Sequence, residues 1–473
     1  MILAAGSGSR KHIAAGLSLG AYAAALAVTP DLSSKALLCA PLVAVPIFWR
    51  LLRTPTAWLA LFLGCALLTP PLPIPWGDSG PHIAMLIAGL GLFIGLLRLA
   101  EWRFQPDALA LALIALWTIF AFSVAMAAVN SGVAIAAASL ARVLLFGISI
   151  YIFLYVRDGP GRLTIRATLR AIRWLFWAGV LSALFACVDF YFQFSPPAGY
   201  EQQFVWLESG VYRRAQGFFY EASTLGNLCA FFLEMIAVAL FLPKGDSTET
   251  PLSRLALFIG AAPLAAALVL SFSRASLVNL AVALVTLVWL RRDRIRWRRL
   301  LAGVAVFGLG GAAILWAAFP VFAQFAWIRV AAAFEYFSES PNAVLSGRID
   351  AWQTLANYLI ANPWRAVIGV GYKTLPYSDF IGAKAVGDNT YLTLLAETGI
   401  AGLCAVIALN IAVLIYAYRA ARSPHPVRSF TGAWMFCFWA GQCVQMFSAD
   451  LLTYWRVLPV YFFVLALAVR APA

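Results

Sequence analysis

Two neighbouring apolar runs decide the fold: ALALALIALWTIFAFSVAMAA at residues 108–128 and VAIAAASLARVLLFGISIYIFLYV at residues 133–156. Each is close to the ~20 residues that an α-helix needs to cross the hydrocarbon core of a bilayer. Arg142 is the single charged residue in the two runs. We therefore expect two membrane-spanning helices joined by a tight turn.

The same pattern extends over the whole chain. Of its 473 residues, 63% are hydrophobic and 11% are charged, against about 25% charged in an ordinary soluble domain. This composition excludes a soluble protein and indicates an all-α, polytopic membrane bundle of about 12–14 spans. Fourteen runs approach span length: 13–29, 36–49, 56–74, 81–99, 108–128, 133–156, 172–194, 221–242, 255–271, 275–290, 300–320, 390–418, 430–447 and 452–469.

The basic residues indicate how the bundle is oriented. With the N-terminus in the cytoplasm, most of the 34 Lys and Arg residues fall on cytoplasmic loops, as the positive-inside rule requires. We expect both termini to be cytoplasmic. The basic run RRDRIRWRR at 291–299 then reads as a cytoplasmic anchor beside a span rather than a nucleic-acid site.

Neither cysteine nor histidine forms a pattern that would hold a metal. The seven cysteines lie in apolar runs without a CxxC pair, and the histidines are isolated at His12, His82 and His425. A cation that held a diphosphate would want paired acids such as a DxD motif, and the sequence has none. We expect no metal and no cofactor.

The longest outer segment divides the chain. Residues 1–320 hold the first eleven predicted spans, with a short outer loop at 195–220, and residues 390–473 hold the last spans. The segment between them, 321–389, is expected to form a helical cap on the outer face.

Two helices are expected within that cap. Apolar residues recur every three or four positions over 344–361, which predicts an amphipathic helix that Asn362 and Pro363 end. Residues 321–337 are aromatic and apolar, as in a helix that lies at the membrane interface.

Arginines on the predicted outer side are the first candidates for chemistry, because the positive-inside bias otherwise removes arginine from this side. They are Arg213 and Arg214 in the short loop, Arg274 in a turn, and Arg348 in the cap. One such arginine could simply reach lipid headgroups. Several together suit a diphosphate-bearing lipid, which guanidinium groups bind bidentately. An enzyme, a flippase and a binding protein would all need them.

A carboxylate beside these arginines would distinguish an enzyme from a carrier. Asp388 lies where the cap enters a span, next to Asn389 and Tyr391 as further binding candidates. It could accept a proton from an attacking sugar hydroxyl, or it could cap the helix. Glu221 opens another span near Arg214, where it could orient a guanidinium or act as the base.

Three charges inside the predicted spans need partners, because an unpaired charge there costs at least ~2.5 kcal/mol. Arg142 and Glu234 are expected to pair or to face a polar cavity. Glu397 lies on the same face as Thr393, which favours an interhelical hydrogen bond.

Four motifs together carry a family resemblance. They are RxxGFFxEAxxLGN at 214–227, SFSRAS at 271–276, SGRIDAW at 346–352 and GDNTYLTLLAETGIAGL at 387–403. In this order they resemble the O-antigen ligase and Wzy-type polymerase superfamily of bacterial membrane glycosyltransferases. The resemblance implies a GT-C-like helical fold in the inner membrane and a periplasmic active site. It also implies metal-independent glycan transfer from undecaprenyl diphosphate.

The resemblance also assigns roles to individual residues. It implies that Arg214 and Arg274 bind the diphosphate, that Arg348 matches the loop's GR motif, and that Asp388 occupies the catalytic position. The familiar ligases have His-Asn where this chain has Asp388-Asn389. This departure puts lipid A core as the acceptor in doubt and favours a polymerase or a related exopolysaccharide enzyme.

The expected partners are the lipid-linked donor, a glycan, lipid or protein acceptor, membrane lipids and other polysaccharide-assembly proteins, with no nucleic acid. A lipid-linked oligosaccharide flippase is the alternative in another class. It would need arginines deep in several spans and two related halves. A scaffold without activity stays open.

Overall fold

The computed structural model describes most of the chain in two units, Met1–Trp58 and Leu59–Ala473. The first unit contains α1 (Gly6–Val28). The predicted spans 36–49 and 300–320 and the predicted interface helix 321–337 lie almost wholly outside the described residues. Those described are 6–29, 35, 39, 46, 49–50, 53–72, 80–197, 200, 202–207, 210–241, 251–292, 316–317, 342, 347–380 and 388–470.

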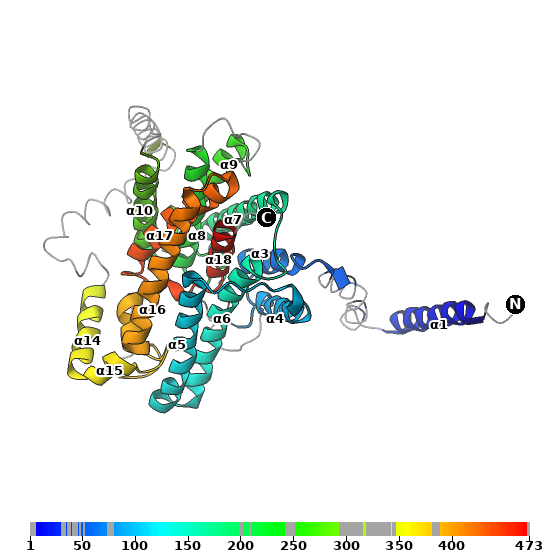
Figure 1. The fold of residues 1–473 in the computed structure, drawn as a ribbon, viewed down its shortest axis with the longest axis horizontal. Helices are drawn as coiled ribbons and strands as arrows, with labels where there is room; N and C mark the ends of the chain where they lie inside the picture. Colours follow the sequence, from blue (N-terminus) through cyan, green and yellow to red (C-terminus); the bar gives the residue numbers. More distant parts are fainter. Residues whose placement is uncertain are drawn as a thin grey trace. The chain divides into compact units, whose positions relative to one another are not determined.

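From α3 onward the chain is a helical bundle (Figure 1). Its helices coincide with the predicted apolar runs, usually within a few residues. They are α3 (Ala57–Leu68), α4 (Ile83–Leu97), η1 (Leu99–Glu101), α5 (Ala108–Ser131), α6 (Val133–Arg157), α7 (Ile165–Phe192), α8 (Ala222–Leu240), α9 (Arg254–Leu270), α10 (Arg274–Leu290), α16 (Thr390–Ala421), α17 (Pro426–Gln445), η4 (Leu451–Thr453) and α18 (Leu458–Val469).

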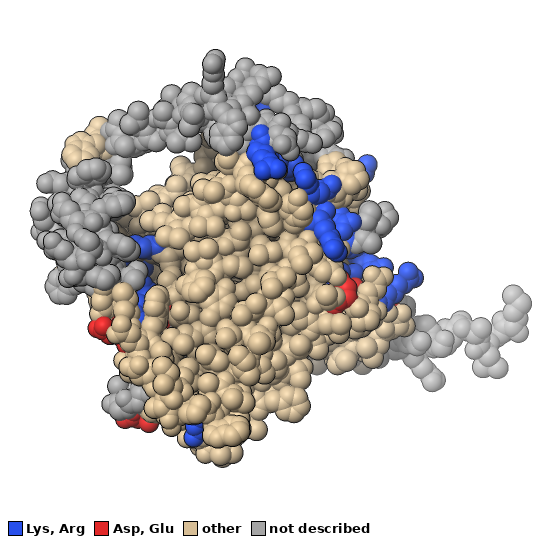
Figure 2. All heavy atoms as spheres, turned by 60° about the vertical axis from the view of Figure 1, so that its left-hand side comes forward, with Lys and Arg blue, Asp and Glu red and all other residues tan. Residues whose placement is uncertain are grey.

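Within the described residues, five helices are long and apolar enough to cross a membrane: α5, α6, α7, α8 and α16. Figure 2 shows a broad face of the described residues that carries no acidic or basic side chain, with basic and acidic side chains along its border. Large apolar side chains such as Phe122, Leu144 and Val285 are exposed. Exposed apolar surface of this kind suits contact with lipid. The chain is an all-α, polytopic membrane protein, as its composition predicts.

The centre of the bundle is α18, in which residues Leu458–Ala468 are all buried. A helix that is apolar on every side is buried in this way. It packs against α6 and α17, while α17 also packs against α10 and α16. Gln442 and Gln445 near the end of α17 accept hydrogen bonds from Asn279 of α10, and the carbonyl of Met446 accepts the amide of Thr390, so the starts of α10 and α16 meet the end of α17.

One helix is interrupted. In α16, Gly399 has φ 72° and ψ −171°, and a Cβ there would lie 2.1 Å from a backbone oxygen of the preceding segment. The carbonyls of Ala396 and Glu397 instead accept bonds from the amides of Val370, at 3.0 Å, and Gly371, at 2.8 Å. The glycine break therefore lets the loop before α16 pack into the bundle.

The described part of the predicted cap contains α14 (Arg348–Ala361) and α15 (Pro363–Ile368). The helix predicted over 344–361 is confirmed as α14, and Asn362 ends it. Leu355 and Leu359 on its predicted apolar face are buried in a cluster with Val370, Leu375 and Ala396.

The predicted outer loop at 195–220 holds a structure that the helical pattern did not predict. Strands β1 (Phe204–Leu207) and β2 (Gly210–Arg213) form an antiparallel hairpin, with Phe204 opposite Arg213 and Leu207 opposite Gly210. The fold is therefore all-α apart from this small ribbon in the described residues.

Candidate functional site

Two of the predicted site residues meet at the start of α16. The Nε of Arg348, the first residue of α14, donates to Oδ2 of Asp388 at 3.1 Å. The side chains of Arg348 and Asp388 are 26% and 44% exposed, so a substrate can reach both. The structure thus places a guanidinium directly beside the carboxylate proposed to accept a proton.

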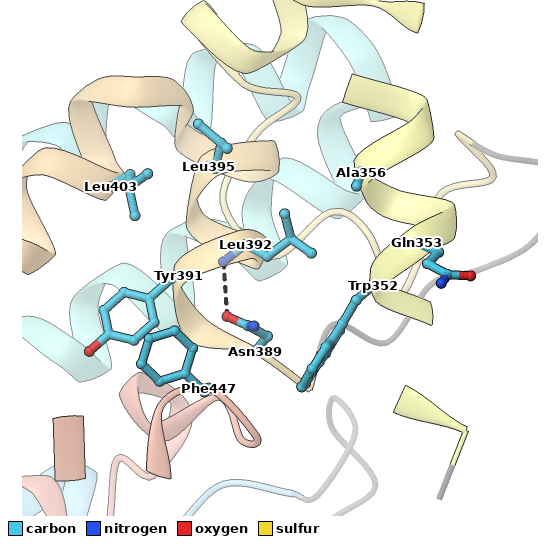
Figure 3. Close-up of a pocket in the computed structure, with 9 residues that line it drawn as sticks. All are labelled: Trp352, Gln353, Ala356, Asn389, Tyr391, Leu392, Leu395, Leu403 and Phe447. Atoms are coloured by element: carbon cyan, nitrogen blue, oxygen red, sulfur yellow. Dashed lines mark hydrogen bonds between the residues drawn. The ribbon is translucent and has the colours of Figure 1, made fainter. Parts of the chain in front are cut away.

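The role of helix cap falls to the neighbouring residue. Oδ1 of Asn389 accepts the amide of Leu392 at 3.1 Å, which makes Asn389 the N-cap of α16 (Figure 3). An N-cap side chain satisfies one of the free amides of the first helical turn. Since Asn389 supplies this bond, the carboxylate of Asp388 is left to Arg348.

An apolar groove of about 430 Å³ lies beside this pair, between α14 and the start of α16 (Figure 3). Tyr391 lines it with its ring, while its hydroxyl donates to the carbonyl of Cys443 at 3.0 Å. The groove borders Asn389 and is therefore close to Asp388. Its lining residues are Trp352, Gln353, Ala356, Asn389, Tyr391, Leu392, Leu395, Leu403 and Phe447.

Arg214 is held on the turn that leads to Arg274. Its Nε donates to the carbonyl of Ser271 at 2.7 Å, and its Nη1 donates to Oε1 of Gln203 at 2.5 Å. Ser271 lies three residues before Arg274, so the hairpin arginine and the turn arginine belong to one local structure.

Arg213 points elsewhere. It forms a buried ion pair with Asp189 of α7, with Nη2 and Oδ1 2.6 Å apart and both side chains 5% exposed. Successive residues of a strand point to opposite faces, and the ladder continues past β2, because the amide of Arg214 donates to the carbonyl of Gln203 at 2.8 Å. The hairpin therefore sends these adjacent arginines to different surroundings.

Arg274 is an exposed residue at the first position of α10. Ser273 caps this helix, since its hydroxyl accepts the amide of Ser276. The turn packs closely on α8: a Cβ added to Gly226 would lie 2.8 Å from Oγ of Ser271 and 2.9 Å from Oγ of Ser276. The glycine of the LGN motif is thus required for this approach.

Glu221 lies at the N-cap position of α8, where its carboxylate accepts the hydroxyl of Thr224 at 3.3 Å. Tyr454, between η4 and α18, is buried within electrostatic range of this carboxylate and of Asp388. Burial raises the pKa of the Tyr454 hydroxyl well above its usual value, and the charges of Glu221 and Asp388 raise it further. No motif in the sequence selects Tyr454.

Of the three predicted intramembrane charges, Arg142 and Glu397 find partners other than those expected. Arg142 lies over the ring of Tyr377, with 4.7 Å from the guanidinium carbon to the ring centroid, and also donates to its hydroxyl. Glu234 is buried on α8, and neither of its carboxylate oxygens bonds Arg142 of α6, so the expected pair does not form. Glu397 accepts the amide of Leu375 at 3.4 Å, so its partner is the buried loop and not a neighbouring helix.

Sequence reasoning also missed a buried ion pair. Lys373, in the loop before α16, pairs with Asp450, in the turn after α17. Burial lowers the pKa of Lys373 to about 8, although the charge of Glu397 opposes the shift. Both residues were visible as charges on the predicted outer side, but neither stands in a motif with a known spacing.

Comparison with known families adds one match. Residues 259–407 match the family model described as O-antigen ligase. The matched region runs from α9 to the first part of α16 and contains Arg274, Arg348 and Asp388. It confirms the resemblance to the O-antigen ligase and Wzy-type superfamily. No curated protein matches the chain at a significant level.

Proposed function

We propose that this chain, whose residues 259–407 match the O-antigen ligase family, is a metal-independent, inverting glycosyltransferase. It moves a glycan from a polyprenyl diphosphate carrier, such as undecaprenyl diphosphate, to an acceptor hydroxyl. The reaction takes place on the periplasmic face of the bacterial inner membrane, with both termini of the protein in the cytoplasm.

The contact between Arg348 and Asp388 carries this proposal. A general base must lie within hydrogen-bonding reach of the proton that it accepts, and its orientation must be fixed. The guanidinium fixes one oxygen of the carboxylate, while partial exposure leaves room for an acceptor hydroxyl. A carrier that forms no bond would not need a carboxylate in this position.

The reaction balances without a further reagent. The acceptor hydroxyl attacks the anomeric carbon of the donor glycan as Asp388 takes its proton. A new C–O bond forms, and the bond between the anomeric carbon and the diphosphate oxygen breaks. Attack from the side opposite the leaving group inverts the anomeric centre.

The leaving diphosphate gains charge as its bond breaks, and positively charged donors in a partly dry site stabilise that charge. We assign this role to Arg214, Arg274 and Arg348. Glu221 supports it by orienting the cationic groups around the start of α8. Arg213, which is buried against Asp189, holds the hairpin in place behind Arg214.

The apolar groove beside Asn389 supports a lipid-linked donor. Its volume of about 430 Å³ accommodates only part of a long prenyl chain. We place in it the prenyl units nearest to the diphosphate, with Tyr391 and Trp352 against the chain. The diphosphate would then lie at the end of the groove that Asn389 lines, next in sequence to Asp388 and its partner Arg348.

The acceptor is proposed to be a growing polysaccharide rather than lipid A core, because Asp388 stands where the familiar ligases have histidine. This makes the chain a Wzy-type polymerase or an exopolysaccharide enzyme, which would act beside other assembly proteins. A ligase would differ in its acceptor and not in the diphosphate site.

A flippase for the same lipid is the second candidate, because an interrupted span such as α16 is common in transporters. Here, however, the carbonyls at the interruption are bonded to the loop amides of Val370 and Gly371. This packing gives the interruption a structural reason that does not involve transport.

The test is a transfer assay with purified protein in detergent, a lipid-linked oligosaccharide donor and an unlinked acceptor glycan. The proposal expects a longer glycan and released polyprenyl diphosphate. Arg274→Ala should abolish both products while the protein remains folded. A protein that moves the donor from one leaflet of a proteoliposome membrane to the other, but forms no new glycosidic bond in detergent, would instead be a flippase.

A further inference from the structure

The loop between α15 and α16 is buried along residues 370–375. Buried backbone outside regular structure is stable only when its polar groups have partners. Here the helices provide them: the amide of Tyr372 donates to Oγ of Ser123 at 3.3 Å, and Oγ of Ser139 donates to the carbonyl of Tyr372 at 2.6 Å. The ring of Tyr372 also stacks on Phe120, with centroids 4.2 Å apart. The loop is thus fixed to α5 and α6.

This loop carries one ammonium group into the protein. Lys373 is 6% exposed and has φ 58°, an uncommon conformation for a residue with a side chain. Its ammonium pairs with Asp450 and interacts at longer range with Glu397, Arg142 and Glu221. A buried charge in a strained backbone position is costly, so the rest of the structure must hold it there.

The partner, Asp450, belongs to the turn that holds the start of α16. The amide of Thr390 donates to the carbonyl of Met446 at 2.8 Å, and the hydroxyl of Thr390 donates to the carbonyl of Ala449 at 2.7 Å. The amide of Leu451 donates back to the same hydroxyl at 3.3 Å. Thr390 lies two residues after Asp388. The turn therefore determines where Asp388 stands.

We propose that Lys373 and Asp450 are positioning residues, whose ion pair joins the buried loop to the 446–451 turn and thereby sets the place of Asp388. Neither residue is proposed to touch the substrate. The pair also sets the start of the segment that leads to Tyr454, which lies near both Asp388 and Glu221. This inference rests on the proposed function for its kinetic consequences but not for its structural ones.

The kinetic test compares Lys373→Met, Asp450→Asn and the double variant in the transfer assay. Misplacing a catalytic group by about 1 Å can cost on the order of 100-fold in rate. We expect both single variants to lower kcat roughly 10- to 100-fold with the donor KM unchanged. The double variant should be no worse than either, because residues that act as one unit do not have additive effects.

Arg98→Met is the matched control. It removes a cation from an ion pair outside the buried loop and the 446–451 turn, because Arg98 pairs with Glu101 of η1 at 2.8 Å. We expect its kcat to stay near wild type. The proposal is overturned if Lys373→Met abolishes transfer while Asp450→Asn does not, because Lys373 would then act on the substrate itself. The proposal is also overturned if the single variants only raise the donor KM. It is overturned as well if the loss of kcat in the double variant equals the product of the two single losses.

Hydrogen exchange gives a readout that needs no activity. Lys373→Met and Asp450→Asn should lower the protection of amides at the start of α16 and in the 446–451 turn, and leave α10 unchanged. Unchanged protection at α16 contradicts the proposal. If the wild type transfers no glycan, the proposed function fails, and exchange still decides the role of the ion pair. If Lys373→Met does not fold, Asp450→Asn decides it, because Asp450 is partly exposed.

Discussion

The Nε of Arg348 lies 3.1 Å from Oδ2 of Asp388, 40 residues further along the chain. Arg348 begins one helix, and Asp388 stands just before the cap of another. Asn389 makes the capping bond of α16. Among the described residues, the hydrogen bond that orients the carboxylate of Asp388 comes from Arg348. The first prediction follows from this division of roles.

Histidine should replace Asp388 with partial activity, because a neutral imidazole also accepts a proton. The rate of Asp388→His should fall as the pH drops below ~6.5, where imidazole becomes protonated. The wild type has no imidazole at residue 388, so its rate should not share this fall. The measurement is the transfer rate between about pH 5 and pH 8. If the wild type and Asp388→His lose activity over the same acidic pH range, residue 388 is not the base.

The neighbouring arginines Arg213 and Arg214 should give opposite phenotypes. Arg213→Met leaves Asp189 buried without its partner, which typically costs about 3–5 kcal/mol, so thermal stability should fall. Arg214→Gln should fold normally and raise the donor KM by roughly tenfold, because a charge-assisted hydrogen bond to phosphate is lost. Thermal unfolding and donor titration of both variants check this. A stable Arg213→Met that binds donor poorly would reverse the assignment.

Gly226→Ala should weaken the turn that carries Arg274. The added Cβ would lie 2.8 Å from Oγ of Ser271, and overpacking of this kind costs typically 1–3 kcal/mol. We expect a lower Tm and slower transfer. Gly89→Ala is the control, since a Cβ there meets nothing within 4 Å. Equal behaviour of the two variants would mean that α8 need not approach the turn closely.

His82 should make stability depend on pH. Its Nδ1 accepts the amide of Ala84 at 3.1 Å, and burial, followed by the charge of Arg456, lowers its pKa to about 4. The unfolded chain, with a pKa near 6.5, binds the proton first, so stability is full above ~6.5 and falls towards pH ~4.

Asn in place of His82 keeps a capping side chain without the titration. The loss between about pH 6.5 and pH 4, at most ~3 kcal/mol, should therefore shrink in His82→Asn. Thermal unfolding of both proteins across this range measures it. A pH dependence that is the same in both would assign the effect to other groups.

Hydrophobic run length predicted most of the bundle, because a helix in lipid must satisfy its own backbone and so follows the apolar runs closely. The period of the apolar residues also predicted α14 and its end at Asn362. Motif order was enough to select Arg348 and Asp388 as candidates. The local sequence was sufficient for the spans and for α14, because each of these helices is determined by its own run of residues.

Features that depend on tertiary contacts could not be predicted. The RR pair at 213–214 gives no sign that a hairpin separates its two side chains. Lys373 and Asp450 lie far apart in the sequence and meet where the loop packs beside the interruption of α16 at Gly399. Tyr454 is an ordinary aromatic residue until folding places it near Asp388.

The most direct test is the rate of glycosidic bond formation by Asp388→Asn at saturating donor. Asparagine keeps the shape of the side chain and its contact with solvent but cannot accept the proton. The account predicts that kcat falls by at least about 100-fold while donor binding is retained, since general-base catalysis typically contributes 10²–10⁴-fold. Transfer at the wild-type rate by a folded Asp388→Asn protein would contradict it.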